Sequence, residues 1–108
     1  QADVAIGETA DDRKARKRAE AALRQKLSPY RKQQSSLEKK MDELQARLVT
    51  LEQDLSDPEL YSEQGRERLK TMLSDQGSAK SQLAEVEAQW LEISEAVEDL
   101  ESELTTQD

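Results

Sequence analysis

The sequence predicts an all-α protein, an antiparallel two-helix coiled-coil hairpin, and three observations support this prediction. The composition is 37% charged and 34% hydrophobic, with three Gly, two Pro and no Phe, which is typical of coiled coils. Apolar residues recur at alternating spacings of three and four in two long runs, as they do in a coiled coil. Between the runs, a short stretch with Pro58 and Gly65 interrupts the pattern. We therefore expect the chain to turn back there.

The N-terminal part of the chain is expected to contain a linker and a basic helix. Residues 1–11 have no heptad pattern and are predicted to form a mobile linker. A helix is expected over residues 12–28, with Asp12 as its N-cap, because the stretch DRKARKRAEAALRQKL consists of strong helix formers.

The first arm of the coiled coil is expected over residues 29–56. Its seam, the line of side chains that faces the partner helix, has ten positions, of which nine are apolar. These positions are Leu23, Leu27, Tyr30, Gln34, Leu37, Met41, Leu44, Leu48, Leu51 and Leu55. Pro29 lies inside this frame, and it either kinks one helix or begins a new helix that is capped by Ser28. The first arm is thus expected to be kinked or broken near Pro29.

A hairpin turn is expected over residues 57–63. Asp57 is predicted to cap a short helical turn that Pro58 opens. Leu60 and Tyr61 are too apolar to be left in water, so they are expected to close the open end of the helix pair. Packing of Tyr61 against Leu60 is favoured over a contact with a partner at the hairpin tip.

The second arm is expected over residues 64–105, followed by a tail at 106–108. Its seam has eleven positions, of which ten are apolar: Leu69, Met72, Gln76, Ala79, Leu83, Val86, Trp90, Ile93, Val97, Leu100 and Leu104. Gly77 weakens this helix, because glycine costs about 1 kcal/mol relative to alanine in a helix interior. If Leu55 faces Leu69, Trp90 falls near Gln34, and the acidic end of the second arm lies beside residues 13–26. Trp90 is therefore expected in the core.

The net charge of −8 conceals a basic arm and an acidic arm. Residues 12–47 contain twelve Lys or Arg against five acids, whereas residues 82–108 contain nine acids and no base. The candidate nucleic-acid-binding residues are Arg13, Lys14, Arg16, Lys17, Arg18, Arg24, Lys26, Arg31 and Lys32. They either contact phosphates through salt-sensitive attraction or are neutralised by the acidic arm. Tyr30 is the one aromatic residue among them, so sequence-specific binding is not expected.

The residues that most enzymes need are missing from the sequence. There is no His and no Cys, which excludes histidine bases, Ser-His-Asp triads, thiol nucleophiles and zinc clusters of the usual kind. The three glycines form no phosphate-binding loop. We therefore expect a non-catalytic chain with no metal or cofactor site of its own. No apolar run approaches the ~20 residues of a membrane span, and the lack of Cys fits a reducing compartment.

Two stretches resemble a known family. Residues 24–61, RQKLSPYRKQQSSLEKKMDELQARLVTLEQDLSDPELY, are similar to the C-terminal extension of bacterial ABC-F proteins, in which a basic linker and a Lys-Leu-Ser-like step lead into a heptad helix. The Asp-Pro-Glu-Leu-Tyr turn at residues 57–61 is the most specific part of this resemblance. Residues 78–101, SAKSQLAEVEAQWLEISEAVEDLE, are similar to the returning helix of the YheS-like branch. The C-terminal arm of valyl-tRNA synthetase is a similar helical hairpin.

The resemblance implies that the chain is a piece of a cytoplasmic ATPase with two ATP-binding cassettes, often labelled an ABC transporter ATP-binding protein. ATP and Mg²⁺ would be bound by the upstream cassettes, since the chain itself has no Walker or signature motif. The family implies an accessory arm that engages ribosomes in translation, or nucleic acid, and its basic linker corresponds to residues 13–32. The alternative is a protein-interaction module that dimerises or docks on its own ATPase domains. A monomer or weak dimer with no membrane contact is expected.

Overall fold

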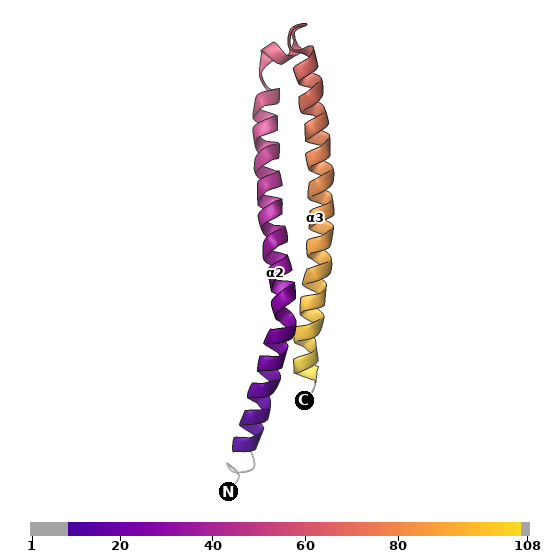
Figure 1. The fold of residues 1–108 in the computed structure, drawn as a ribbon. Coiled ribbons are helices and arrows are strands. Elements are labelled where there is room, and N and C mark those ends of the chain that lie inside the picture. The colour runs from indigo at the N-terminus through magenta and orange to yellow at the C-terminus, as the bar shows by residue number, and fades with distance from the viewer. Residues whose placement is uncertain (1–8, 107–108) are drawn as a thin grey trace.

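The chain folds into a long antiparallel helical hairpin. The computed structural model describes residues 9–106, which form helix α2 (Ala10–Leu55), the short 3-10 helix η1 (Pro58–Tyr61) and helix α3 (Arg66–Thr106). The two long helices run side by side in opposite directions and are joined at η1 (Figure 1). The molecule measures 88 × 20 × 17 Å along its principal axes. The all-α, two-helix coiled-coil hairpin predicted from the sequence is confirmed.

Helix α2 begins two residues earlier than the sequence suggested. Thr9 is the N-cap, and its hydroxyl accepts a hydrogen bond from the backbone N–H of Asp12 at 3.1 Å. The Asp12 carboxylate accepts one from the backbone N–H of Thr9 at 3.4 Å, which completes a capping box. The prediction of Asp12 as the N-cap was wrong, because Thr9 and Asp12 satisfy the free backbone donors as a pair. Residues 1–8 of the expected linker lie outside the described residues.

Pro29 lies inside α2, which continues as one helix of 46 residues. Of the two alternatives for Pro29, one helix that contains it or a new helix that begins at it, the structure has the first. Pro29 is exposed, and its neighbours Leu27 and Tyr30 face α3 as buried and half-buried residues. The contacts of these two seam residues help the helix to tolerate the backbone donor that proline lacks. The N-terminal part of α2 diverges from α3 (Figure 1).

The hydrophobic core is the seam between the two helices. One cluster is formed by Leu44, Ala79 and Val86, with Leu37, Met41, Leu48 and Leu83 packed against it. A second cluster nearer the tip is formed by Leu51, Leu60 and Met72, with Leu55 and Leu69 packed against it. The buried residues retain 3–8% exposure, so none of them is sealed as in a globular core. Each contributes part of the ~1.5–3 kcal/mol expected for a fully buried aliphatic side chain.

The register of the two helices differs from the expected one by about a turn near Trp90. The Gln34 side-chain amide donates to Ser94 Oγ at 3.1 Å, while Trp90 Nε1 donates to the Glu38 carboxylate at 3.3 Å. Trp90 therefore lies near Gln34, as expected, but about one helical turn from the position directly opposite it. A side chain in a coiled coil inserts between residues of the partner helix rather than directly opposite one of them. Trp90 is half-buried at its seam position.

The turn closes the tip with one of the two residues expected there. Asp57 caps η1, and its carboxylate accepts a hydrogen bond from the backbone N–H of Glu59 at 3.0 Å. Leu60 is 3% exposed and packs in the tip cluster, as predicted. Tyr61 does not help to close the tip, since it is 65% exposed. Its hydroxyl donates to the Leu55 carbonyl at 2.7 Å, which satisfies a free acceptor at the C-terminal end of α2.

Gly65 connects the turn to α3 through two backbone hydrogen bonds. Its N–H donates to the Ser62 carbonyl at 3.1 Å, and its carbonyl accepts from the Leu69 N–H at 2.8 Å. A Cβ atom at this position would lie 2.6 Å from the Cα of Leu60, well inside van der Waals contact. Its φ angle is not positive, so Gly65 is required for the space it leaves and not for its conformation.

Replacing Gly77 with alanine is expected to raise the free energy of unfolding by about 1 kcal/mol. Gly77 lies in the interior of α3, and a Cβ atom there would meet nothing within 4 Å. The substitution therefore improves helix propensity without a steric cost. Urea unfolding followed by circular dichroism at 222 nm measures the change. An unchanged or lower stability would mean that the glycine has a packing role at this position.

Candidate nucleic-acid interface

The nine candidate basic residues all lie on α2, and all nine are exposed. Each of these residues lies either outside the seam or on the part of α2 that α3 does not cover, so its charged group is in contact with solvent. Arg31 forms an ion pair with Glu101 of α3, with an N–O distance of 3.6 Å. Because both side chains are about half exposed, at 55% and 50%, this pair contributes only about 0–1 kcal/mol to stability.

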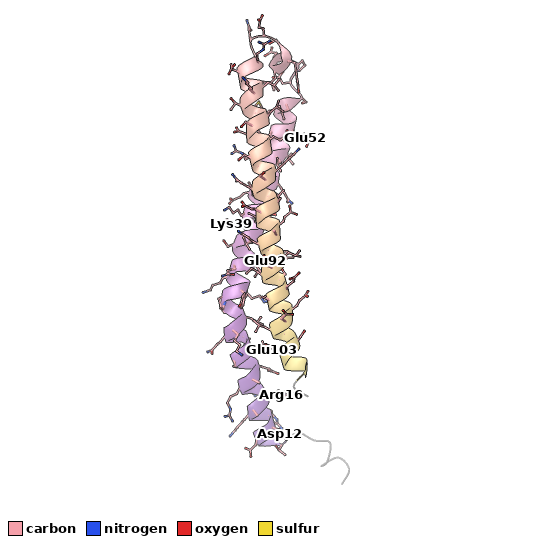
Figure 2. The ribbon with its side chains drawn as sticks, turned by 90° about the vertical axis from the view of Figure 1, so that its right-hand side faces the viewer. Asp12, Arg16, Lys39, Glu52, Glu92 and Glu103 are labelled. Carbon is pink, nitrogen blue, oxygen red and sulfur yellow. The ribbon has the colours of Figure 1, made fainter. Side chains whose placement is uncertain are left out.

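The acidic end of α3 reaches less far along α2 than predicted. Beyond Glu101, α3 continues for five residues to Thr106, a rise of only about 8 Å. Below Arg31, α2 continues to Ala10, a rise of about 30 Å. Helix α2 therefore extends past the end of α3, and Figure 2 shows Arg16 and Asp12 beyond the level of Glu103. The expectation that the acidic end lies along residues 13–26 was wrong, since the pairing of Glu101 with Arg31 sets a different register.

The part of α2 that extends past α3 is exposed and rich in basic residues. Every residue from 10 to 18 is exposed, and we call these residues the projecting segment. It contains five of the nine candidates, Arg13, Lys14, Arg16, Lys17 and Arg18, together with Asp11 and Asp12. The sequence indicated these charges, but the heptad pattern alone did not show that they project beyond the hairpin.

Three of the other four candidates lie beside α3, and the fourth, Arg24, lies on α2 between them and the projecting segment. Lys26, Arg31 and Lys32 are on the stretch of α2 that contains the buried Leu27 and the half-buried Tyr30 and Gln34. Exposed carboxylates of α3 lie near this level, and Glu101 is the one that pairs with Arg31. The positive potential of these three cations is thus partly offset within the molecule. The basic residues consequently fall into a projecting group and a group that faces the acidic arm.

Closer to the tip, charges of opposite sign also face one another across the hairpin. Arg47 lies 3.7 Å from the Asp75 carboxylate, and both side chains are about half exposed.

The described residues contain no cluster of three or more acidic side chains that would suit a metal ion. Within the same residues, neither long helix has an apolar stretch that would cross a membrane.

The fold and its charges define an accessory coiled-coil domain, and a comparison with protein families agrees with this class. The model of the family described as the ABC transporter C-terminal domain matches residues 26–95. The chain belongs to this family. It is thus the C-terminal extension of an ABC transporter ATP-binding protein, and such a domain is not itself catalytic.

The matched residues include most of the seam of both helices and the turn, but not the projecting segment. No curated protein and no solved structure matches the chain. Membership of the family thus accounts for the hairpin. The role of the basic residues that precede the matched region has to be inferred from their charge and exposure.

Proposed function

We propose that this chain is the C-terminal arm of an ABC-F-type ATPase of the YheS-like branch and that it contacts ribosomal RNA or DNA through its basic segment, residues 13–32. The membership of the ABC transporter C-terminal domain family supports the position of the arm in its parent protein. The parent is a cytoplasmic protein whose upstream cassettes bind ATP and Mg²⁺. The arm itself performs no chemistry and acts by positioning.

The observation that carries the proposal is the exposure of all nine basic side chains on one helix. Arginine and lysine side chains displace condensed counterions from phosphates, and this release favours binding at low salt whatever the base sequence. The hairpin supplies reach, since its long axis measures 88 Å. Phosphate contact therefore requires no pocket and no pre-formed base-reading surface.

The test is binding of the chain to ribosomes and to duplex DNA over a series of salt concentrations. We expect the affinity to fall steeply with salt, because each phosphate contact contributes a slope of about −0.9 in a plot of log K against log salt. Substituting Arg16, Lys17 and Arg18 with Glu is expected to weaken binding by about tenfold or more. A matched variant with Lys39, Lys40 and Lys70 changed to Glu carries the same change in charge on exposed positions outside the basic segment.

Two outcomes would contradict the proposal. If the folded chain does not bind either target at low salt, the arm does not act through nucleic acid. If both charge-reversal variants lose the same affinity, the attraction is a property of the total charge and not of the basic segment.

A protein-interaction module is the second candidate. Leu73 and Leu91 of α3 are 50% and 56% exposed, although both are large and apolar. They lie about 27 Å apart along α3 and form no continuous patch, but contact of either one with the cassettes of the parent or with a second copy of the chain would cover its apolar surface. Sedimentation equilibrium of the chain, and its binding to the isolated cassettes, distinguish this candidate. Such binding in the absence of any affinity for ribosomes or DNA would support it.

A further inference from the structure

The projecting segment differs from the rest of the hairpin in width. The molecule has cross-sectional extents of 20 and 17 Å, with two helices side by side in its body, whereas a single α-helix with its side chains is about 10–12 Å across. The major groove of B-form DNA is about 12 Å wide and admits one helix. The body is therefore too wide for that groove, and the projecting segment is not.

The charges of the projecting segment are distributed around the helix in a way that suits a groove. At 100° per residue, Arg16, Arg13, Lys17, Lys14 and Arg18 fall in that order within an arc of roughly 200°. A helix that lies on one phosphate strand needs cations on one narrow face. A helix in a groove has a phosphate strand on either side of it, and a basic arc of more than half the circumference reaches both.

The acidic residues of the segment do not interrupt this arc. Asp12 lies about 40° outside it and is held in the capping box with Thr9. Asp11 lies about 20° beyond the position of Arg18, at the opposite edge. The segment carries five cations and two carboxylates, so its net charge is +3, whereas the whole chain has a net charge of −8. Its positive potential is accordingly concentrated at the end of the molecule farthest from the tip (Figure 2).

We propose that the projecting segment, residues 10–18, lies in the major groove of duplex DNA, with the five cations on the phosphates of both strands and the hairpin body outside the groove. This inference rests on the proposed function and names the part of the basic segment that makes the contact. Double-stranded RNA does not suit the same geometry, because its major groove is deep and too narrow for side chains to read. The acidic surface of α3 stays outside the groove, away from the phosphates.

The experiment uses the 108-residue chain and fluorescence anisotropy with a 20-base-pair DNA duplex and an RNA duplex of the same sequence. One variant changes Lys14, Lys17 and Arg18 of the projecting segment to Gln. The matched variant changes Lys26, Arg31 and Lys32, which lie beside α3, to Gln and removes the same charge. Circular dichroism checks that both variants remain helical.

We expect the first variant to lose about tenfold or more in affinity for the DNA duplex, and its salt slope to fall by about three. The matched variant is expected to lose less than about threefold, and the unmodified chain to bind the RNA duplex at least about tenfold more weakly than DNA. Equal losses in the two variants, or equal affinity for DNA and RNA duplexes, would overturn the groove assignment and leave the proposed function standing. Absence of binding to DNA, RNA and ribosomes at low salt would overturn both.

Discussion

Replacing Gly65 with alanine is expected to lower the free energy of unfolding by about 3 kcal/mol. The added Cβ atom would lie 2.6 Å from the Leu60 Cα and 2.7 Å from the Leu60 carbonyl oxygen, so the obstacle is backbone and not the flexible end of a side chain. The turn has to move away from α3, and Leu60, which closes the tip at 3% exposure, moves with it. The other buried side chains of the tip cluster, Leu51 and Met72, then become more exposed to water.

Urea unfolding and sedimentation measure this effect together. The matched control is Gly77→Ala, the same chemical change in the interior of α3, with open space around the new methyl group. The two substitutions are expected to change stability in opposite directions. If Gly65→Ala leaves both stability and oligomeric state unchanged, the close approach of η1 to Gly65 does not occur in solution. If the variant forms a dimer, the turn has opened and the arms pair between copies.

The second large effect is expected from Val86→Asp in the seam. Val86 is 5% exposed and packs with Leu44 and Ala79 in the central cluster. A carboxylate there is removed from water with no cation beside it in the cluster, at a cost of about 3 kcal/mol or more. A hairpin with so few buried side chains has little stability to lose, so we expect most of the helical signal at 25 °C to disappear.

Val49→Asp is the control for this substitution, because Val49 is 53% exposed and lies on α2 outside the seam. Both variants lose a valine and gain an aspartate within a helix, so the difference between them reports burial. The control is expected to change stability by no more than about 0.5 kcal/mol. Thermal unfolding of the two variants checks the prediction, and equal destabilisation would show that the helices do not pack through Val86.

The seam was predictable because its physical cause is local in the sequence. Leu44, Leu51, Met72 and Val86 were assigned to it by their spacing, and each is buried at the interface. Any pair of helices that carries such stripes lowers its free energy by covering them. The hairpin turn was predictable for a similar reason, since Asp57 and Pro58 favour a helix start in almost any context.

What was missed depends on three-dimensional contacts. Tyr61 is exposed while its hydroxyl donates to the Leu55 carbonyl at the end of α2, and its apolar ring gave no indication of either. The steric requirement for Gly65 arises from the approach of η1, which exists only in the folded turn. The charges of the candidate interface were visible in the sequence. Which of them project past α3 depends on the register, and Glu101 and Arg31 define it.

The antiparallel arrangement places the first turn of α2 and the last turn of α3 at one end of the molecule, with η1 at the other (Figure 1). Both connections to any neighbouring domain are therefore made at the same end. A small tilt of that end is converted into a displacement of the tip that grows in proportion to the 88 Å axis. The hairpin is geometrically a lever. The displacement of its tip for a given tilt increases with the number of heptads between Leu23 and Leu55.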